Sequence, residues 1–194
     1  MKNRRLIRIA SVLAAGTAAI SGLHAAVTDT SRSPAEGAVA SRSPDLQIVT
    51  KLAQGSSAEI ELGRIVKSKA RNPAVKAFGQ RMITDHSALL ADATRWASER
   101  RITLDATPGQ EEKKIIDRTA RLSGDDFDRS YIEGMLDDHK KDVAEVARFI
   151  AAHPDSPATG LLKQALPTLE DHLRVAENVA GQIGVKPDAG LTRS

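Results

Sequence analysis

The sequence predicts an all-α protein in which four long helices form a bundle, with a short extra helix between the second and the third. Apolar residues recur every three or four positions over four long segments, which is the spacing of one helix face. No segment shows the alternation of apolar and polar residues that is typical of a half-buried strand. The chain holds only five aromatic residues, so we expect a core packed by aliphatic side chains.

Residues 1–25 have the layout of a secretory signal peptide. Four basic residues come first, an apolar run from Ile9 to Leu23 follows, and the small residues Ala25 and Ala26 come next. The run is short for a membrane span, which needs about 20 residues, and an uncleaved anchor is the alternative. We therefore expect an exported, periplasmic protein without an integral membrane span after cleavage.

The basic charge of the chain lies in this N-terminal segment. The whole sequence carries +3, but without residues 1–25 it has 24 basic and 25 acidic residues. This balance and the scarcity of aromatic residues argue against a nucleic-acid partner, and no motif indicates a protein partner. The absence of cysteine excludes disulfides, thiolate metal sites and cysteine nucleophiles.

Residues 26–44 are rich in Ser, Thr, Pro and Arg and lack periodicity, which predicts a disordered linker. The predicted four-helix domain covers residues 45–184, an ordinary size for a single domain. Residues 185–194 are predicted to form a flexible tail.

The first long helix is expected from Asp45 to Arg71. The Asn72-Pro73 pair ends it and starts the second helix, because Asn caps a helix N-terminus well and Pro suits its first position. The second helix is expected to run to about Arg101. A turn at Thr107-Pro108-Gly109 follows.

A short helix is expected over residues 110–122, followed by a third long helix that Ser123-Gly124-Asp125-Asp126 caps. The residues 154–157 turn the chain into the fourth long helix, in which Pro167 should produce a kink. The second helix is about 43 Å long, and segment 102–122 can return along that length. A crossover that makes the second and third helices parallel is therefore possible, and a simple up-down order also fits.

On each long helix a titratable side chain lies where the core is expected, and these four are Glu59, His86, His139 and His172. At about 100° per residue, Glu59 falls in the middle of its apolar stripe, whereas Glu61 faces the opposite way. All four residues are near the middle of their helices. We therefore expect their side chains to meet at one level of the core.

Imidazole and carboxylate groups together suit Fe, Mn, Zn or Cu, and the core of a helix bundle is a common place for such sites. Asp142 lies one turn after His139 on the same face and can add a second carboxylate. The candidate metal ligands are therefore Glu59, His86, His139, Asp142 and His172. The alternative is a structural layer, in which the histidines satisfy one another, a carboxylate and trapped water without a metal.

An aspartate directly precedes each of these three histidines. Asp85 and Asp138 lie close enough to the apolar face to support a metal ligand. Asp171 is expected to point outward. His153, the remaining histidine of this region, is expected to complement the helix dipole at the end of the third long helix.

Seven motifs occur in order between residues 45 and 180 and together resemble one family. They are Leu52-Ala53-Gln54-Gly55, Ala58-Glu59-Ile60-Glu61-Leu62-Gly63, the segment from Asn72 to Met82, Asp85-His86, Phe127-Asp128-Arg129, Asp138-His139-Lys140-Lys141-Asp142, and Leu166-Pro167-Thr168-Leu169 with His172 after it. The family is an exported bacterial domain of unknown function, often labelled outer-membrane or exported protein and grouped with ferritin-like folds.

The resemblance implies a ferritin-like four-helix bundle in the periplasm and no established activity. Iron-carboxylate proteins of that fold use Glu-x-x-His on two helices. Here Met82 and Leu136 stand three residues before His86 and His139, where those proteins have glutamate. The sequence therefore favours a mononuclear or histidine-rich metal site. A non-catalytic envelope or stress-associated interaction protein is the alternative function.

Overall fold

The structure is a computed structural model that describes residues 43–185, and these residues form five α-helices with no strand among them. The predicted signal peptide over 1–25, most of the predicted linker and residues 186–194 lie outside the described residues. None of the five helices combines enough length with enough apolarity to cross a membrane.

The first two helices are α2 (Pro44–Lys69) and α3 (Pro73–Glu99). α2 begins one residue earlier than expected, because the Ser43 hydroxyl accepts the Leu46 N–H at 3.2 Å. Ser43 and Pro44, placed in the linker by the sequence, thus start the helix. α3 has the predicted cap, in which the Asn72 side chain accepts the Ala74 N–H at 2.8 Å.

Three further helices follow, α4 (Gln110–Ala120), α5 (Gly124–Ala152) and α6 (Thr159–Ile183). Ser123 is the N-cap residue of α5 as expected, although its side chain makes no capping hydrogen bond. His153 follows the last residue of α5 at the C-cap. α6 continues through Pro167 without ending there, and the kink at this residue stays a prediction.

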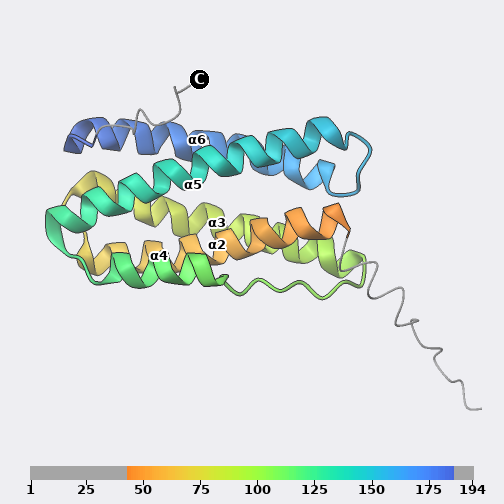
Figure 1. The fold of residues 1–194 in the computed structure, drawn as a ribbon, viewed down its shortest axis with the longest axis horizontal. Coiled ribbons are helices and arrows are strands. Elements are labelled where there is room, and N and C mark those ends of the chain that lie inside the picture. Colours follow the sequence, from red (N-terminus) through yellow and green to blue (C-terminus); the bar gives the residue numbers. More distant parts are fainter. Residues whose placement is uncertain (1–42, 186–194) are drawn as a thin grey trace, which may run out of the picture. The chain divides into compact units, whose positions relative to one another are not determined.

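α3 and α5 run in the same direction (Figure 1). Near the end of α3, the Trp96 indole N–H donates to the Pro157 carbonyl at 2.9 Å, in the turn between α5 and α6. At the other end, an Asp128 carboxylate oxygen in the first turns of α5 accepts the Asn72 N–H at 2.7 Å, beside the turn between α2 and α3. The segment that includes α4 therefore returns along the helices, and the crossover is the correct alternative.

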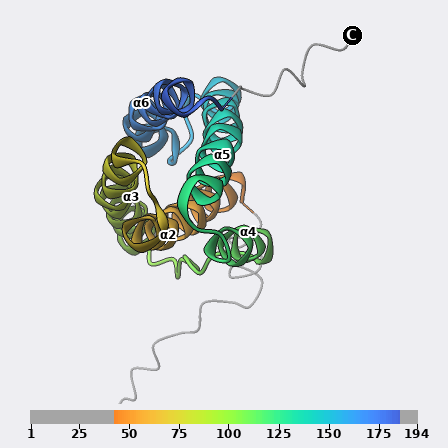
Figure 2. The same cartoon turned by 90° about the vertical axis from the view of Figure 1, so that its left-hand side faces the viewer.

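Seen end-on, α2, α3, α6 and α5 surround a common core, and α4 lies outside it beside α2 and α5 (Figure 2). α2 and α3 approach closely at two glycines. A Cβ on Gly63 would lie 2.7 Å from the Gly79 carbonyl oxygen, and one on Gly79 would lie 2.6 Å from Val66 Cγ1. α2 and α5 make few direct contacts, which leaves room for a cleft between them.

The apolar core consists of two clusters, one toward each end of the helices. The first includes Phe78, Phe127 and Tyr131, and the second includes Trp96 and Leu162. Four buried polar residues lie between the two clusters along their helices, and Glu59 lies at the edge of the first cluster beside Ala58; the four are Ser56, His86, His139 and His172. A polar layer therefore divides the core, at the level that the sequence predicts.

Candidate metal centre

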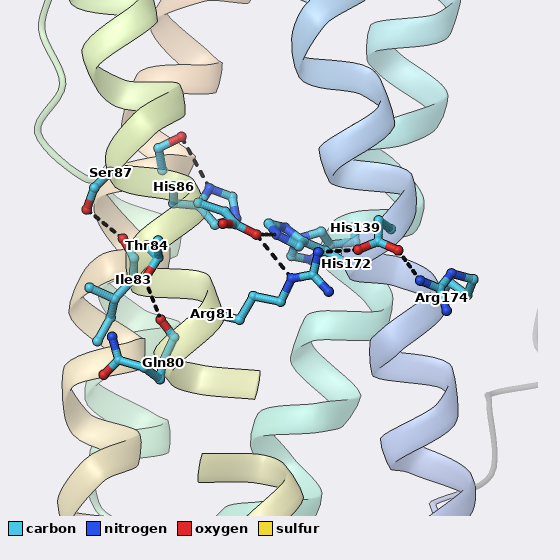
Figure 3. Close-up of polar contacts among 12 residues, drawn as sticks. Gln80, Arg81, Ile83, Thr84, His86, Ser87, His139, His172 and Arg174 are labelled. Carbon is cyan, nitrogen blue, oxygen red and sulfur yellow. Dashed lines mark hydrogen bonds and ion pairs between the residues drawn. The ribbon is translucent and has the colours of Figure 1, made fainter. Parts of the chain in front are cut away.

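Three histidines from three helices meet in this polar layer. His86 of α3, His139 of α5 and His172 of α6 are 2%, 1% and 0% exposed. Their ring centroids are 5.1 to 5.7 Å apart, and the rings turn toward one another (Figure 3). One nitrogen of each ring lies within 4.8 Å of those of the other two. We call these residues the histidine triad.

Each ring of the triad has a protein oxygen against one nitrogen. His139 Nδ1 lies 3.0 Å from the carbonyl oxygen of Met135, and His172 Nε2 lies 2.9 Å from Asp85 Oδ2. Both oxygens are acceptors, so both nitrogens carry hydrogen. His86 Nδ1 lies 3.3 Å from the Ser56 hydroxyl. Contacts of this kind orient metal-binding imidazoles and fix their tautomers.

The remaining nitrogens of the triad face one another. His139 Nε2 and His172 Nδ1 are 3.3 Å apart. With both rings neutral and their hydrogens on the outer nitrogens, each of these two atoms presents a lone pair to the other. His86 Nε2 is buried and has no hydrogen-bond partner among the described residues. Either an extra proton or a cation can satisfy such an arrangement.

Burial opposes the binding of an extra proton by the imidazoles of the triad. Burial, followed by the charges of His139 and His172, lowers the pKa of His86 well below 6.5. Burial and then His172 lower the pKa of His139 to about 4. Burial also lowers the pKa of His172, although its hydrogen bond to Asp85 opposes this shift. At neutral pH the triad therefore consists of neutral imidazoles, which is the form that binds a metal.

Charged residues of α3 and α6 support the triad from the surface. Arg81 donates to Asp85 at 3.1 Å and also pairs with Asp171, which pairs with Arg174 (Figure 3). Burial alone would raise the pKa of Asp85, but the hydrogen bonds from His172 and Arg81 outweigh it and lower that pKa. The prediction that Asp171 points outward is incomplete, because this residue is half-buried and holds Arg81 in place.

The candidate carboxylates lie on α2 and α5. Glu59 is 5% exposed, and its Oε2 has no hydrogen-bond partner among the described residues. Glu61 is exposed, as the predicted phase of the helix requires. Burial, then the charges of Asp138 and Asp142, raise the pKa of Glu59 well above 4.5. The structure therefore sets Glu59 among like charges.

A cleft of about 500 Å³ lies beside these carboxylates and is lined by residues of α2, α4 and α5. We call it the acidic cleft. Asp142 is exposed and lines this cleft. Burial, followed by Asp138 and Glu145, raises the pKa of Asp142 to about 7. The pKa of Asp138 is also raised, mainly by burial.

Residues 30–179 match a family described as Domain of unknown function (DUF4142). The chain belongs to the DUF4142 family. No curated protein and no solved structure matches it. The chemistry of this DUF4142 chain therefore has to be argued from its own residues.

The DUF4142 structure brings together three of the five predicted ligands. His86, His139 and His172 form the triad, whereas Glu59 and Asp142 lie in the acidic cleft and outside the group of atoms within 4.8 Å. A ligand role for the two carboxylates stays a prediction. The sequence predicts one site in which histidines and carboxylates are mixed. The structure shows two neighbouring groups, the histidine triad and the carboxylates of the acidic cleft.

Sequence reasoning missed several supporting residues of the DUF4142 chain. The role of Ser56 beside His86 could have been predicted, because this polar residue lies on the apolar face of its helix. Asp85 was expected to support a ligand, but it contacts His172 of α6 rather than its own neighbour His86. Arg81 carried no signal, because an exposed arginine on a helix is ordinary.

Proposed function

We propose that this DUF4142 chain is an exported, ferritin-like four-helix-bundle protein that binds one transition-metal ion through His86, His139 and His172. The observation that carries the proposal is the pair of ring nitrogens 3.3 Å apart whose hydrogens are held on the opposite side of each ring. Two imidazoles that bind one tetrahedral Zn²⁺ at 2.0–2.1 Å have their nitrogens about 3.4 Å apart. A cation between the rings would therefore replace lone-pair repulsion by coordination.

Three neutral imidazoles favour Zn²⁺ or Cu²⁺ among the metals that the sequence suggests. Fe and Mn sites in helix bundles use Glu-x-x-His. Met82 and Leu136 occupy the glutamate positions of that motif and are buried in an apolar cluster. A pocket of about 30 Å³ lies beside His86 and can hold a water molecule as a fourth ligand.

Two observations support the wider proposal. Parallel α3 and α5, joined by a long crossover, give the chain order of ferritin-like bundles. Export is supported by residues 1–25, in which basic residues are followed by an apolar run, the layout of a signal peptide.

The test is the metal content of the full chain, purified without a polyhistidine tag. We expect one Zn²⁺ or Cu²⁺ per chain by elemental analysis after loading and buffer exchange. We also expect an increase in the unfolding temperature with that metal. His86→Ala, His139→Ala and His172→Ala should each lose the bound metal.

The matched control is His153→Ala, because His153 is exposed at the C-terminus of α5 and lies outside the triad. This variant should bind metal like wild type. A metal-free chain whose unfolding temperature responds to none of Fe, Mn, Zn and Cu would contradict the proposal. The layer of buried polar residues would then be purely structural.

A further inference from the structure

We propose that the acidic cleft is the entrance through which a divalent cation reaches the histidine triad, and that Glu59 binds the cation in passing. This inference rests on the proposed function, because it needs a metal to be taken up by the triad. It adds a role for the carboxylates that do not belong to the triad.

The first observation is the position of Glu59. Its side chain lines the cleft, and the residue is 5% exposed. Its Oε2 has no hydrogen-bond partner among the residues that the structure describes. A buried carboxylate without a partner is unfavourable unless a proton or a cation satisfies it. Glu59 is therefore the carboxylate of the cleft that a passing cation would satisfy.

The second observation is the charge of the lining. Only two of the lining side chains are basic, Lys51 and Lys141. Six are acidic: Glu59, Glu111, Glu112, Asp138, Asp142 and Glu145. A cleft lined by one sign of charge concentrates ions of the other sign and increases their rate of association. The lining of this cleft therefore favours cations over anions.

The third observation connects the cleft to the triad. The small pocket beside His86 is lined by residues that also line the cleft, namely Lys51, Gly55, Asp142 and Glu145. The two spaces thus share one edge, formed by α2 and α5. An ion that reaches this edge from the cleft therefore meets a pocket that Asp142 and Glu145 line together with the His86 ring.

Lys51 and Glu145 pair across this shared edge, from α2 to α5. The pair is largely exposed, since the side chains are 62% and 38% exposed, so it contributes little to stability. Its lysine repels an approaching cation. Removing the ammonium group should therefore accelerate entry without changing the triad.

The experiment measures the rate of Co²⁺ uptake by the full chain in a stopped-flow instrument, from the visible absorption that nitrogen-bound Co²⁺ acquires. Glu59→Gln and Asp142→Asn should each slow uptake about tenfold at low salt, in a buffer alkaline enough to ionise both carboxyl groups. Lys51→Ala should accelerate it. Because the triad is intact in all three variants, each should still bind one Co²⁺ per chain.

Glu61→Gln is the matched control, since Glu61 lies two residues from Glu59 on the exposed face of α2. Its uptake rate should equal that of wild type. Stoichiometric binding at the wild-type rate in Glu59→Gln and Asp142→Asn would overturn the entrance and leave the proposed function intact. So would weaker equilibrium binding with unchanged association, because Glu59 would then be a ligand of the final site. A wild-type chain that binds no Co²⁺, Zn²⁺ or Cu²⁺ would overturn both proposals.

Discussion

The histidine triad and the carboxylates of the acidic cleft are neighbouring groups of buried or partly buried titratable residues. They differ in how many hydrogen-bond partners the protein gives them. Each ring of the triad has an oxygen against its outer nitrogen, from Ser56, Met135 or Asp85. Glu59, by contrast, has a carboxylate oxygen without a partner among the described residues. The three rings of the triad are each oriented by a protein contact, whereas Glu59 lines an open cleft.

Burial affects the ionisation of the two groups in opposite directions. It lowers the pKa of the histidines and raises the pKa of Glu59, Asp138 and Asp142. The neutral form is favoured in both groups, but only a neutral histidine is ready to bind a cation. The triad is therefore suited to holding a metal, and the carboxylates are suited to exchanging protons for one.

The largest effect in the metal-free protein is expected for His139→Leu. The pKa of His139 is about 4 in the folded chain, against 6.5 in the unfolded chain. Below pH 6.5 the unfolded chain therefore binds a proton that the folded chain does not, and stability falls as the pH decreases toward 4. Relative to wild type, the variant should gain about 3 kcal/mol of unfolding free energy over this interval.

Urea unfolding in chelator at several pH values between 4 and 7 measures this gain. His153→Leu supplies the baseline, since His153 is exposed and outside the triad. A difference between His139→Leu and wild type that stays constant across this pH range would show that the histidine is not held neutral.

Glu59→Gln tests the other group and should have the opposite pH dependence. The folded pKa of Glu59 is raised above 4.5, so the folded chain binds more protons than the unfolded chain above that pH. Wild-type stability therefore decreases as the pH rises, and the variant should gain about 2 kcal/mol relative to it in alkaline buffer. Urea midpoints of both proteins and of Glu61→Gln measure the gain, and an equal gain in Glu61→Gln would contradict it.

Asp85→Asn should weaken metal binding without removing a ligand. The amide oxygen of Asn can still accept from His172 Nε2, but it carries no charge, so the charge-assisted contact of 2.9 Å is weakened and the pair with Arg81 is lost. Loss of a partner of this kind typically lowers metal affinity by about 10- to 100-fold. Competition with a chelator of known affinity measures the change. Asp92→Asn is the control, since Asp92 also lies on α3 but pairs with Arg95 at the surface; an equal loss there would contradict the role of Asp85.

Tyr131→Phe should have the smallest effect. The Tyr131 hydroxyl is buried without a hydrogen-bond partner in the described part of the chain, and the charge of Glu59 acts on it. Removing an unpartnered hydroxyl should raise the free energy of unfolding by about 1 kcal/mol. Thermal unfolding at neutral pH checks the sign. A loss of stability would mean that the hydroxyl is bonded, and Glu59 would then be the partner to test.

The sequence predicted the helices and the level of the polar layer because both follow from periodicity along one helix. The caps at Asn72 and Ser123 and the burial of Glu59 with Glu61 exposed are local consequences of spacing. The common level of the polar residues on the four helices therefore follows from spacing along each helix.

The pairing of residues from different helices could not be predicted, because it depends on how each helix is rotated and which helices are neighbours. Asp85 could be assigned to His86 or to another histidine, and only the contact of α3 with α6 decides for His172. The separation of Glu59 from the triad likewise depends on the few contacts between α2 and α5. Periodicity determines which side of a helix faces the core, whereas the packing of the helices determines which residue of another helix it contacts.

The proposed metal centre requires that the neutral imidazoles of His139 and His172 direct lone pairs toward each other and that His86 Nε2 joins them when a metal binds. Long-range ¹H–¹⁵N spectra of the histidine rings, recorded at neutral pH with and without one equivalent of Zn²⁺, test it most directly. The account predicts hydrogen on Nδ1 of His139 and Nε2 of His172 in the metal-free chain, and Zn²⁺ should shift His139 Nε2, His172 Nδ1 and His86 Nε2 together. A doubly protonated His172 in the metal-free chain, with ring signals that Zn²⁺ leaves unchanged, would contradict it.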